Sequence, residues 1–292
     1  LQICGEGVYV DGTLGRAGHS LEIAKRLTTG RLISLDQDPD AVQTARARLA
    51  GLPATVVQIN FRYAGQALEQ LGIETINGAL LDLGVSSHQL DDAARGFSYM
   101  QDAPLDMRMD TSAPLSAADI VNTWSQEELR RILWQYGEER YSGPIAAAIV
   151  RAREQAPIQT TGQLADLIRG AMSAKARREK QHPAKRSFQA IRIAVNDELG
   201  EVERMLDTAL NLLRPGGRIA VISFHSLEDR LVKSAFAQWA SGCTCPPDFP
   251  VCVCGRAATV KAVTRKPITA SAEELAENPR ARSATLRIIE HL

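Results

Sequence analysis

The sequence predicts an α/β fold in which a mostly parallel sheet is covered by helices and interrupted by an all-helical insertion. Three observations lead to this fold class. Along residues 1–110, short apolar runs flanked by turn residues alternate with helical patterns, as expected of buried parallel strands and their crossover helices. Residues 111–187 carry mainly helical patterns, and residues 188–292 return to alternating strands and helices. We therefore expect one α/β domain in two parts, 1–110 and 188–292, around a helical domain.

The first part should contain four strands and three helices. The strands are expected over residues 7–13, 30–36, 54–60 and 76–87, the last of them ending in a polar loop. Apolar residues at helical spacing predict a helix around Leu21 and Leu27, a second over 39–52 and a third over 64–72. A glycine close to the end of the second helix is typical of a C-cap.

The remaining elements follow from the same patterns. Helices are expected over 116–137, 144–155 and 161–173, each starting at Ser, Thr or Pro. A long helix from about residue 195, a Pro-Gly-Gly turn at 215–217 and a fifth strand come next, and residues 284–292 form the last strand. Repeated strand–helix units of this kind predict a parallel sheet with helices on both faces.

Composition excludes several classes of protein. The chain has 292 residues, 45% of them hydrophobic, and its 34 basic residues balance 34 acidic ones. Zero net charge argues against a protein coated with basic residues, although local basic patches remain open. We find no apolar run of the roughly 20 residues that span a bilayer and no signal peptide pattern, so a cytoplasmic protein without membrane contact is expected.

The segment Tyr-Val-Asp-Gly-Thr-Leu-Gly-Arg-Ala-Gly-His-Ser, from Tyr9, places glycines at positions 12, 15 and 18 between a strand and a helix. Dinucleotide-binding turns need G-x-G-x-x-G, and the leucine at position 14 breaks that spacing. Asp11 ends the first strand and places negative charge nearby, which disfavours a pyrophosphate and suits a sulfonium. Asp36 ends the second strand, where a carboxylate accepts hydrogen bonds from ribose hydroxyls. These features indicate S-adenosylmethionine, with turn glycines and a helix-capping aspartate as the alternative.

Further motifs complete a resemblance. These are LDQDP, LLDLGVSSHQLDDAARGFSYMQDAPLDMRMD, YGEERYSGPIAAAIV, HPAKRSFQAIRIAVNDEL, LLRPGGRIAVISFHSLEDRLVK and NPRARSATLRI. Together with the glycine-containing turn, in this order over nearly the whole chain, they resemble the bacterial cytosine-N4 methyltransferases of small-subunit (16S) ribosomal RNA. The resemblance implies a class I S-adenosylmethionine-dependent methyltransferase: a Rossmann-like, mostly parallel seven-stranded sheet with an inserted all-helical domain.

The same resemblance implies a cofactor site. Its residues would be Ala17, Gly18, His19, Asp36, Phe61, Asp82 and Gln89. Many relatives have glycine where this chain has Ala17, and binding through the backbone should tolerate the extra methyl group. Roles without ligand contact stay open for three of these residues: Phe61 as a core residue, His19 as a helix cap and Gln89 as an exposed loop residue.

The reaction implied is transfer of a methyl group to the exocyclic N4 of a cytidine by direct in-line attack. The amine needs an acceptor for its proton as it gains positive charge. Asp82 is the leading acceptor, and His225 in Ser-Phe-His-Ser is a second candidate whose alternative role is to hold a loop. Cytosine-N4 DNA enzymes carry Ser-Pro-Pro-aromatic after the fourth strand, whereas this chain has Asp82-Leu-Gly-Val.

A basic cluster close to the end of the helical domain is the candidate RNA-binding segment. Between Lys175 and Arg192, seven side chains are basic and one, Glu179, is acidic, with His182 and Phe188 interleaved. An ordinary solvated helix end is the alternative. The residues expected to contact RNA are Lys175, Arg177, Arg178, Lys180, Lys185 and Arg186. The expected partner is small-subunit ribosomal RNA within an assembled or nearly assembled subunit, and the protein itself would be a monomer or a homodimer.

Four of the five cysteines form C-x-C, six residues and C-x-C, at positions 243, 245, 252 and 254. Four thiolates so close together could bind zinc, and free thiols or a disulfide are the alternatives. No metal ligand is assigned from the sequence. Two other functions also stay open: a methyltransferase acting on DNA, and a non-catalytic ribosome assembly factor that binds the cofactor.

Overall fold

The computed structural model describes residues 1–292 apart from 180, 244, 247–248, 252 and 256. The chain forms two compact units, one of residues 1–84 with 199–292 and one of residues 85–198. The helical unit therefore extends beyond the expected 111–187 at both ends. Its additional N-terminal part carries Phe97, Leu105 and Met107, which are buried in the same apolar cluster as the helices. Strand and helix patterns alone could not show this, because the segment has an irregular backbone.

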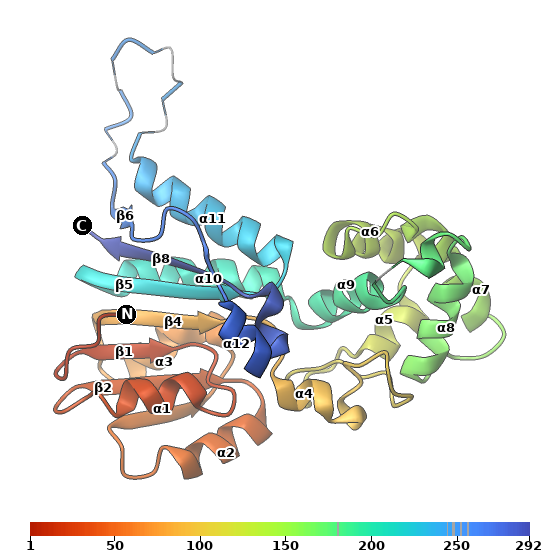
Figure 1. The fold of residues 1–292 in the computed structure, drawn as a ribbon, viewed down its shortest axis with the longest axis horizontal. Helices are drawn as coiled ribbons and strands as arrows, with labels where there is room; N and C mark the ends of the chain where they lie inside the picture. Colours follow the sequence, from red (N-terminus) through yellow and green to blue (C-terminus); the bar gives the residue numbers. More distant parts are fainter. Residues whose placement is uncertain (180, 244, 247–248, 252, 256) are drawn as a thin grey trace. The chain divides into compact units, whose positions relative to one another are not determined.

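The α/β unit is built on one sheet, in the order β3-β2-β1-β4-β5-β8-β6, with β7 paired to β8 (Figure 1). The first five strands in that order are parallel, and β8 runs antiparallel to β5. The strands are β1 Val8–Asp11, β2 Arg31–Asp36, β3 Ala54–Gln58, β4 Ile76–Asp82, β5 Leu213–Ser223, β6 Val260–Ala262, β7 Ile268–Thr269 and β8 Thr285–His291. The expected mostly parallel, Rossmann-like sheet is confirmed, with seven strands in one row and the short β7 beside them.

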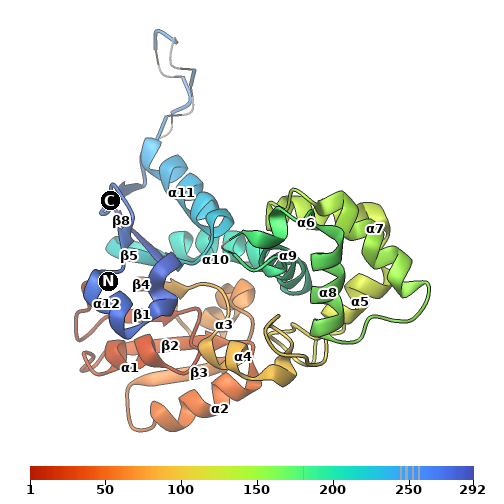
Figure 2. The same cartoon turned by 45° about the vertical axis from the view of Figure 1, so that its right-hand side comes forward.

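Helices cover both faces of this sheet (Figure 2). One face packs against α1 and α2 through residues such as Ile23 and Ala45, and the other packs against α3, α10 and α11 through Leu68, Met205 and Val232. Right-handed crossovers produce this arrangement, because the chain reverses its direction across the sheet after β3. The helices are α1 Gly18–Ala24, α2 Pro39–Arg48, α3 Ala64–Gln70, α10 Glu198–Leu212, α11 Ser226–Ser241 and α12 Ala272–Glu277, with the 3-10 turns η1 Phe61–Tyr63 and η4 Pro279–Ser283.

The Pro-Gly-Gly segment, expected as a turn before the fifth strand, lies inside β5 instead. The pairing of β5 with β4 passes from Ile76↔Leu213 to Gly78↔Arg218 with a shift of register. The extra residues form an irregularity in the strand, and Gly216 takes a φ of 76°, a conformation that glycine adopts without steric cost.

The helical unit has a core of its own. Its elements are α4 Ser87–Asp91, η2 Ala93–Arg95, α5 Ala117–Thr123, α6 Gln126–Gly137, α7 Ser142–Arg153, α8 Thr161–Ala171, η3 Ala176–Arg178 and α9 Lys185–Asn196. The expected helix 116–137 is two helices, because Ser125 caps α6 through a reciprocal capping box with Glu128. Leu129, Ile145 and Leu164 are fully buried where α6, α7 and α8 pack together.

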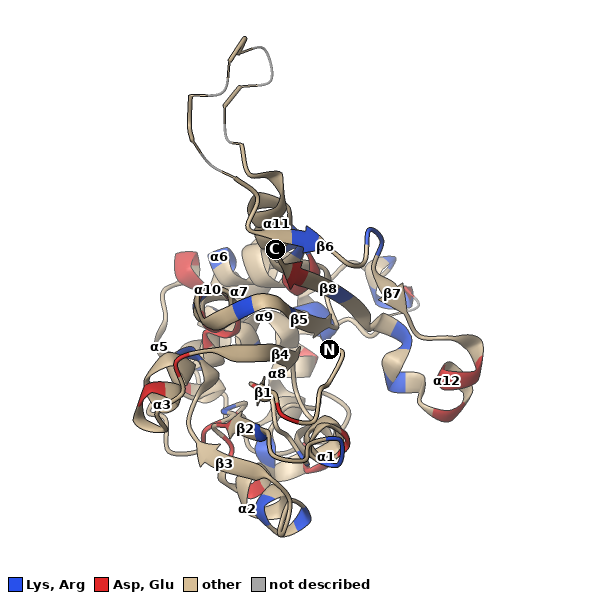
Figure 3. Ribbon diagram, turned by 90° about the vertical axis from the view of Figure 1, so that its left-hand side faces the viewer, with Lys and Arg blue, Asp and Glu red and all other residues tan. Residues whose placement is uncertain are grey.

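Charge is mixed over the α/β unit. Acidic and basic residues are scattered over its helices and strands in Figure 3, as the equal numbers of the two signs in the sequence lead one to expect. Among the described residues, no helix combines the length and apolar character that crossing a bilayer requires.

Candidate active site

Three carboxylates stand at the carboxyl edge of the parallel sheet. Asp11, Asp36 and Asp82 are the last residues of β1, β2 and β4. Since β1 pairs in parallel with both β2 and β4, the three strand ends lie side by side. Ligands of open parallel sheets bind beyond this edge, which makes it the candidate active site.

Asp11 supports the turn that follows β1. Its Oδ2 accepts a 2.6 Å hydrogen bond from Ser20 Oγ, and its Oδ1 accepts one of 3.1 Å from the backbone N–H of Thr13. Burial raises the pKa of the Asp11 carboxyl, and the hydrogen bonds from Ser20 and Thr13 oppose that shift. The side chain is 1% exposed. The carboxylate that first indicated a cationic ligand thus mainly holds the start of α1 in place.

The turn between β1 and α1 has left-handed backbone at two positions. Gly15 has a φ of 49°, and Ala17, the N-cap of α1, has a φ of 62°. Alanine in this region costs about 1 kcal/mol more than glycine. A Cβ on Gly18 would meet no atom within 4 Å, so the first helical residue borders open space. The predicted residues Ala17, Gly18 and His19 are consecutive at this turn: Gly18 and His19 are exposed, whereas Ala17 is fully buried in the apolar core.

Asp36 is tied to the same turn. Its Oδ2 accepts a 2.8 Å hydrogen bond from the backbone N–H of Gly15, and its Oδ1 accepts one of 2.9 Å from Asp38 N–H. Burial raises the pKa of Asp36 to about 6, against the effect of these two backbone hydrogen bonds. Each carboxylate oxygen has two lone pairs, so each can accept one more donor.

Asp82 pairs with His19 across the strand ends. Nε2 of His19 lies 3.5 Å from Asp82 Oδ2, and the hydrogen bond to Asp82 raises the pKa of His19. The backbone N–H of Asp82 donates a 2.6 Å hydrogen bond to Thr13 Oγ1, which fixes the end of β4 against the turn. Oδ1 of Asp82 is buried and finds no hydrogen-bond partner among the residues that the structure describes. A buried carboxylate oxygen without a partner is costly, and it marks a position for a ligand donor.

Phe61 follows β3 and begins the 3-10 turn η1. It is partly buried against the apolar core, and a Cβ built on Gly12 would lie 3.6 Å from Phe61 Cβ. The ring thus belongs to a segment that borders the glycine-containing turn. Asn60, just before it, accepts a hydrogen bond from Arg62 N–H and donates to Gln37 Oε1 at 2.7 Å.

His225 is the N-cap of α11 and faces Glu228. Its Nδ1 accepts a 3.4 Å hydrogen bond from Glu228 N–H, and its Nε2 lies 3.1 Å from Glu228 Oε1, an ion-pair distance without hydrogen-bond alignment. Glu228 Oε2 in turn accepts from the backbone N–H of Phe224 at 2.8 Å. Both ring nitrogens thus lie close to Glu228, in the helix that His225 caps.

Gln89 belongs to the helical unit, in α4. It is 6% exposed, and its Oε1 accepts a 3.0 Å hydrogen bond from Ser86 N–H in a capping box. A sequence of the form Ser-x-x-Gln carries this capping signal, which supports a structural role beside the predicted contact with the cofactor.

The predicted RNA-binding residues that the structure describes lie at η3 and at the start of α9. Lys175, Arg177, Arg178 and Arg186 are exposed, Lys185 is half-buried, and Lys180 lies outside the described residues. The interleaved rings serve packing instead: His182 stacks on Tyr99 with centroids 4.5 Å apart, and Phe188 is buried against the same tyrosine.

A second basic surface was missed by sequence reasoning. A cavity of about 620 Å³ in the helical unit is lined by Glu127, Arg130, Arg131, Trp134, Arg140, Ser142 and Gly143. Trp134 is 61% exposed, although large aromatic side chains are usually buried. The signal was present in the spacing: Trp134 lies on the face of α6 opposite Leu129 and Leu133, together with the arginines.

A Rossmann-like sheet with carboxylates at the ends of β1, β2 and β4, beside a glycine-containing turn, defines a class I S-adenosylmethionine-dependent methyltransferase. The chain matches the model of the MraW methylase family over residues 1–292 and belongs to that family. The expected family and cofactor are thereby confirmed.

Curated relatives agree with this placement. The chain is 58% identical to a ribosomal RNA small subunit methyltransferase H of Symbiobacterium thermophilum, over 97% of this chain and 90% of that one. It is 56% identical to the protein of the same name from Brevibacillus brevis, over 98% of this chain and 92% of the relative. The alignment with the crystal structure of an rRNA methylase from Streptococcus thermophilus covers 99% of this chain and 89% of that chain, with a TM-score of 0.44 and 10% identity.

Proposed function

We propose that this protein transfers a methyl group from S-adenosylmethionine to the exocyclic N4 of one cytidine in small-subunit (16S) ribosomal RNA. The observation that carries the proposal is Asp82, whose buried Oδ1 has no described partner at the carboxyl edge of the sheet. The names of the relatives supply the substrate class, small-subunit ribosomal RNA.

The residues at the turn fit the cofactor. Asp36 keeps free lone pairs for two ribose hydroxyls, and Gly18 and His19 are exposed at the turn that Asp36 supports, next to the buried Ala17. Phe61, which follows β3 beside the glycine-containing turn, would pack on the adenine, and Gln89 remains a predicted cofactor contact. When bound, S-adenosylmethionine supplies an electrophilic methyl group on a positively charged sulfur.

Asp82 provides the chemistry on the side of the base. The lone pair of a cytosine amine is delocalised into the ring, so the amine is a weak nucleophile that must be held in line. Oδ1 of Asp82 accepts a hydrogen bond from the N–H of the cytosine amine. It stabilises the positive charge that develops on the nitrogen and then takes the proton. The ion pair with His19 and the hydrogen bond from Asp82 N–H to Thr13 keep this carboxylate oriented.

His225 is the second predicted catalytic residue, and its contacts favour a positioning role. Nδ1 accepts from Glu228 N–H, and Nε2 lies 3.1 Å from the Glu228 carboxylate. Such a histidine holds the loop after β5 against α11. We therefore place the proton acceptor at Asp82 and assign His225 to the loop.

The helical unit supplies the RNA contacts in this proposal. Arginines around an exposed tryptophan provide phosphate contacts and a surface on which an unpaired base stacks. The exposed basic residues of η3 and α9 are further candidate phosphate contacts. The net charge of the chain is zero, so RNA phosphates alone would attract it weakly. We therefore place the substrate in an assembled or nearly assembled subunit in the cytoplasm, where ribosomal proteins would also contact the enzyme.

The test is transfer of labelled methyl from S-adenosylmethionine to small subunits lacking the modification, to their naked RNA and to duplex DNA. Digestion and mass analysis of the nucleosides then identify the product. We expect N4-methylcytidine at one site in the subunit. Label in DNA alone would indicate a DNA enzyme, and tight cofactor binding without label in any substrate would favour a non-catalytic assembly factor.

Cofactor affinity should depend on pH through Asp36. The ionised carboxylate accepts hydrogen bonds from the ribose hydroxyls better than the protonated form does. With a pKa of about 6, Asp36 is mostly protonated at pH values below 6. Affinity should therefore stay constant above pH 7 and fall about tenfold between pH 7 and pH 5, one unit below the pKa. Calorimetric titration at a series of pH values measures this effect. Asp36→Asn should bind weakly with a flat profile, and an equally steep profile in that variant would assign the dependence to another group.

RNA affinity should depend on Trp134. Loss of one stacked base costs about 1–3 kcal/mol, so Trp134→Ala should weaken binding of the small-subunit RNA about 5- to 150-fold. Trp134→Phe should retain most of the affinity. Filter binding at fixed salt measures the change, with Met100→Ala, a 74% exposed apolar residue of the same unit, as the control. Equal affinities of Trp134→Ala and the wild type would remove this surface from the RNA interface.

A further inference from the structure

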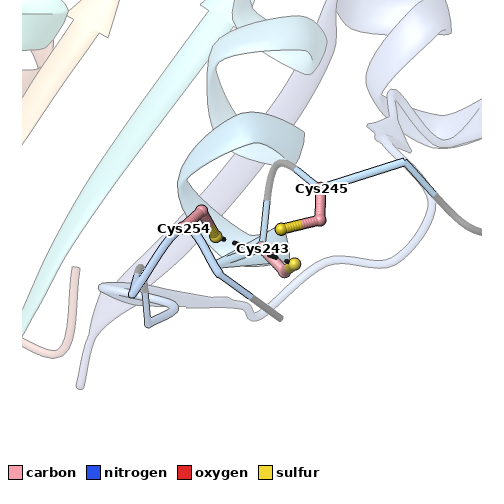
Figure 4. Close-up of side chains that lie close together, drawn as sticks. All are labelled: Cys243, Cys245 and Cys254. Carbon is pink, nitrogen blue, oxygen red and sulfur yellow. Dashed lines mark hydrogen bonds between the residues drawn. The ribbon is translucent and has the colours of Figure 1, made fainter. Parts of the chain in front are cut away.

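The three described cysteines of the C-x-C motifs lie together in the segment between α11 and β6. The Sγ atoms of Cys243, Cys245 and Cys254 are all within 4.8 Å of one another, and those of Cys243 and Cys254 are 3.8 Å apart. Figure 4 shows the three labelled side chains with their sulfur atoms close together. Among the described cysteines, no two are joined by a disulfide. Cys252 lies outside the described residues, so the argument rests on these three.

The spacing of the sulfur atoms suits a tetrahedral metal ion. Zinc–sulfur bonds of about 2.3 Å at tetrahedral angles place the sulfur atoms about 3.8 Å apart. The distance between Cys243 Sγ and Cys254 Sγ has this value. The backbone N–H of Val253 also donates to Cys245 Sγ at 3.4 Å, the kind of outer hydrogen bond that orients a thiolate ligand.

Apolar packing does little to hold this segment. Its three largest apolar side chains, Phe249, Val251 and Val253, are 52%, 68% and 72% exposed. The two ends of the segment nevertheless meet: a Cβ on Gly242 would lie 2.4 Å from Ala258 N, and Thr259 N–H donates to Trp239 O at 3.1 Å. A segment whose two ends meet, and whose described apolar side chains are exposed, is typical of segments that a structural metal stabilises.

We propose that Cys243, Cys245 and Cys254 bind one zinc ion as thiolates. Each thiol releases its proton to solvent as its zinc–sulfur bond forms, and no atom changes oxidation state. The site lies at the C-terminal end of α11, whereas His225 caps the N-terminus of the same helix. With 16 residues the helix is about 24 Å long, so the metal stabilises the segment and takes no part in methyl transfer.

Metal content of the full-length protein, purified without chelator, tests the proposal. We expect about one zinc per chain, lost from Cys243→Ser and Cys254→Ser and retained in Cys4→Ser, since Cys4 is an exposed free cysteine outside the cluster. Zinc below one-tenth of an equivalent after reduction and zinc loading would overturn the proposal. So would zinc retained by the Cys243→Ser Cys254→Ser double variant, or iron with visible absorption in place of zinc.

Cobalt substitution keeps the test independent of variants that fail to fold. Cobalt added to reduced, metal-free wild-type protein should give the intense absorption of tetrahedral cobalt bound to thiolates, in a titration that ends near one equivalent. Zinc should displace the cobalt and remove that absorption. Cobalt that gives only the weak spectrum of the hydrated ion would contradict a thiolate site.

Discussion

Asp82→Asn is expected to lower the rate of methyl transfer by about 100- to 10,000-fold, the range that a positioned proton acceptor contributes. Asparagine has the shape of aspartate, and the backbone N–H of residue 82 still donates to Thr13. The amide oxygen is a much weaker base than a carboxylate and carries no charge to offset the developing ammonium. The loss should therefore fall on the chemical step, with cofactor affinity reduced less than about tenfold.

Single-turnover rates at saturating S-adenosylmethionine, with binding measured by calorimetry, separate the two effects. Glu74→Gln is the matched control, because Glu74 is an exposed carboxylate just before the opposite end of the same strand. It should leave rate and affinity unchanged. A rate for Asp82→Asn within threefold of the wild type would remove Asp82 from the chemistry. A variant that loses affinity yet keeps its saturated rate would reduce Asp82 to a cofactor contact.

Asp36→Ala is expected to weaken S-adenosylmethionine binding by at least about 100-fold. Two hydrogen bonds to a charged acceptor contribute about 1.5–3 kcal/mol each, and 1.4 kcal/mol corresponds to a factor of ten. The saturated rate should change little, because ribose contacts act in binding and in the transition state alike. Asp36 also accepts from Gly15 and Asp38, so the substitution removes part of the support of the turn.

Thermal unfolding distinguishes lost contacts from a lost fold. Asp40→Ala, at an exposed carboxylate four residues further along, should retain both affinity and melting temperature. If Asp36→Ala melts like the wild type and binds as tightly, the ribose is held elsewhere. Asp36→Asn keeps the size of the side chain and one acceptor oxygen, and its affinity should lie between those of Asp36→Ala and the wild type.

Several features of this protein follow from local sequence. The alternation of β-branched runs with helical spacing predicted the strands β1 to β4 and the helices between them, because burial on a sheet or helix imposes its own period on the residues. The aspartates at positions 11, 36 and 82 followed from the same reasoning, since each closes an apolar run. Parallel strands bring such ends to one edge of a sheet, so a shared site was predictable.

Other features depend on partners far apart in the chain. No local pattern shows that segment 85–110 packs with the helices, or that His182 and Phe188 pack against Tyr99. The pairing of His19 with Asp82 joins the turn after β1 to the end of β4. Periodicity within one element indicates which of its faces is buried. Which side chains meet was decided only by the tertiary structure, because a contact depends on two segments that can lie far apart in the sequence.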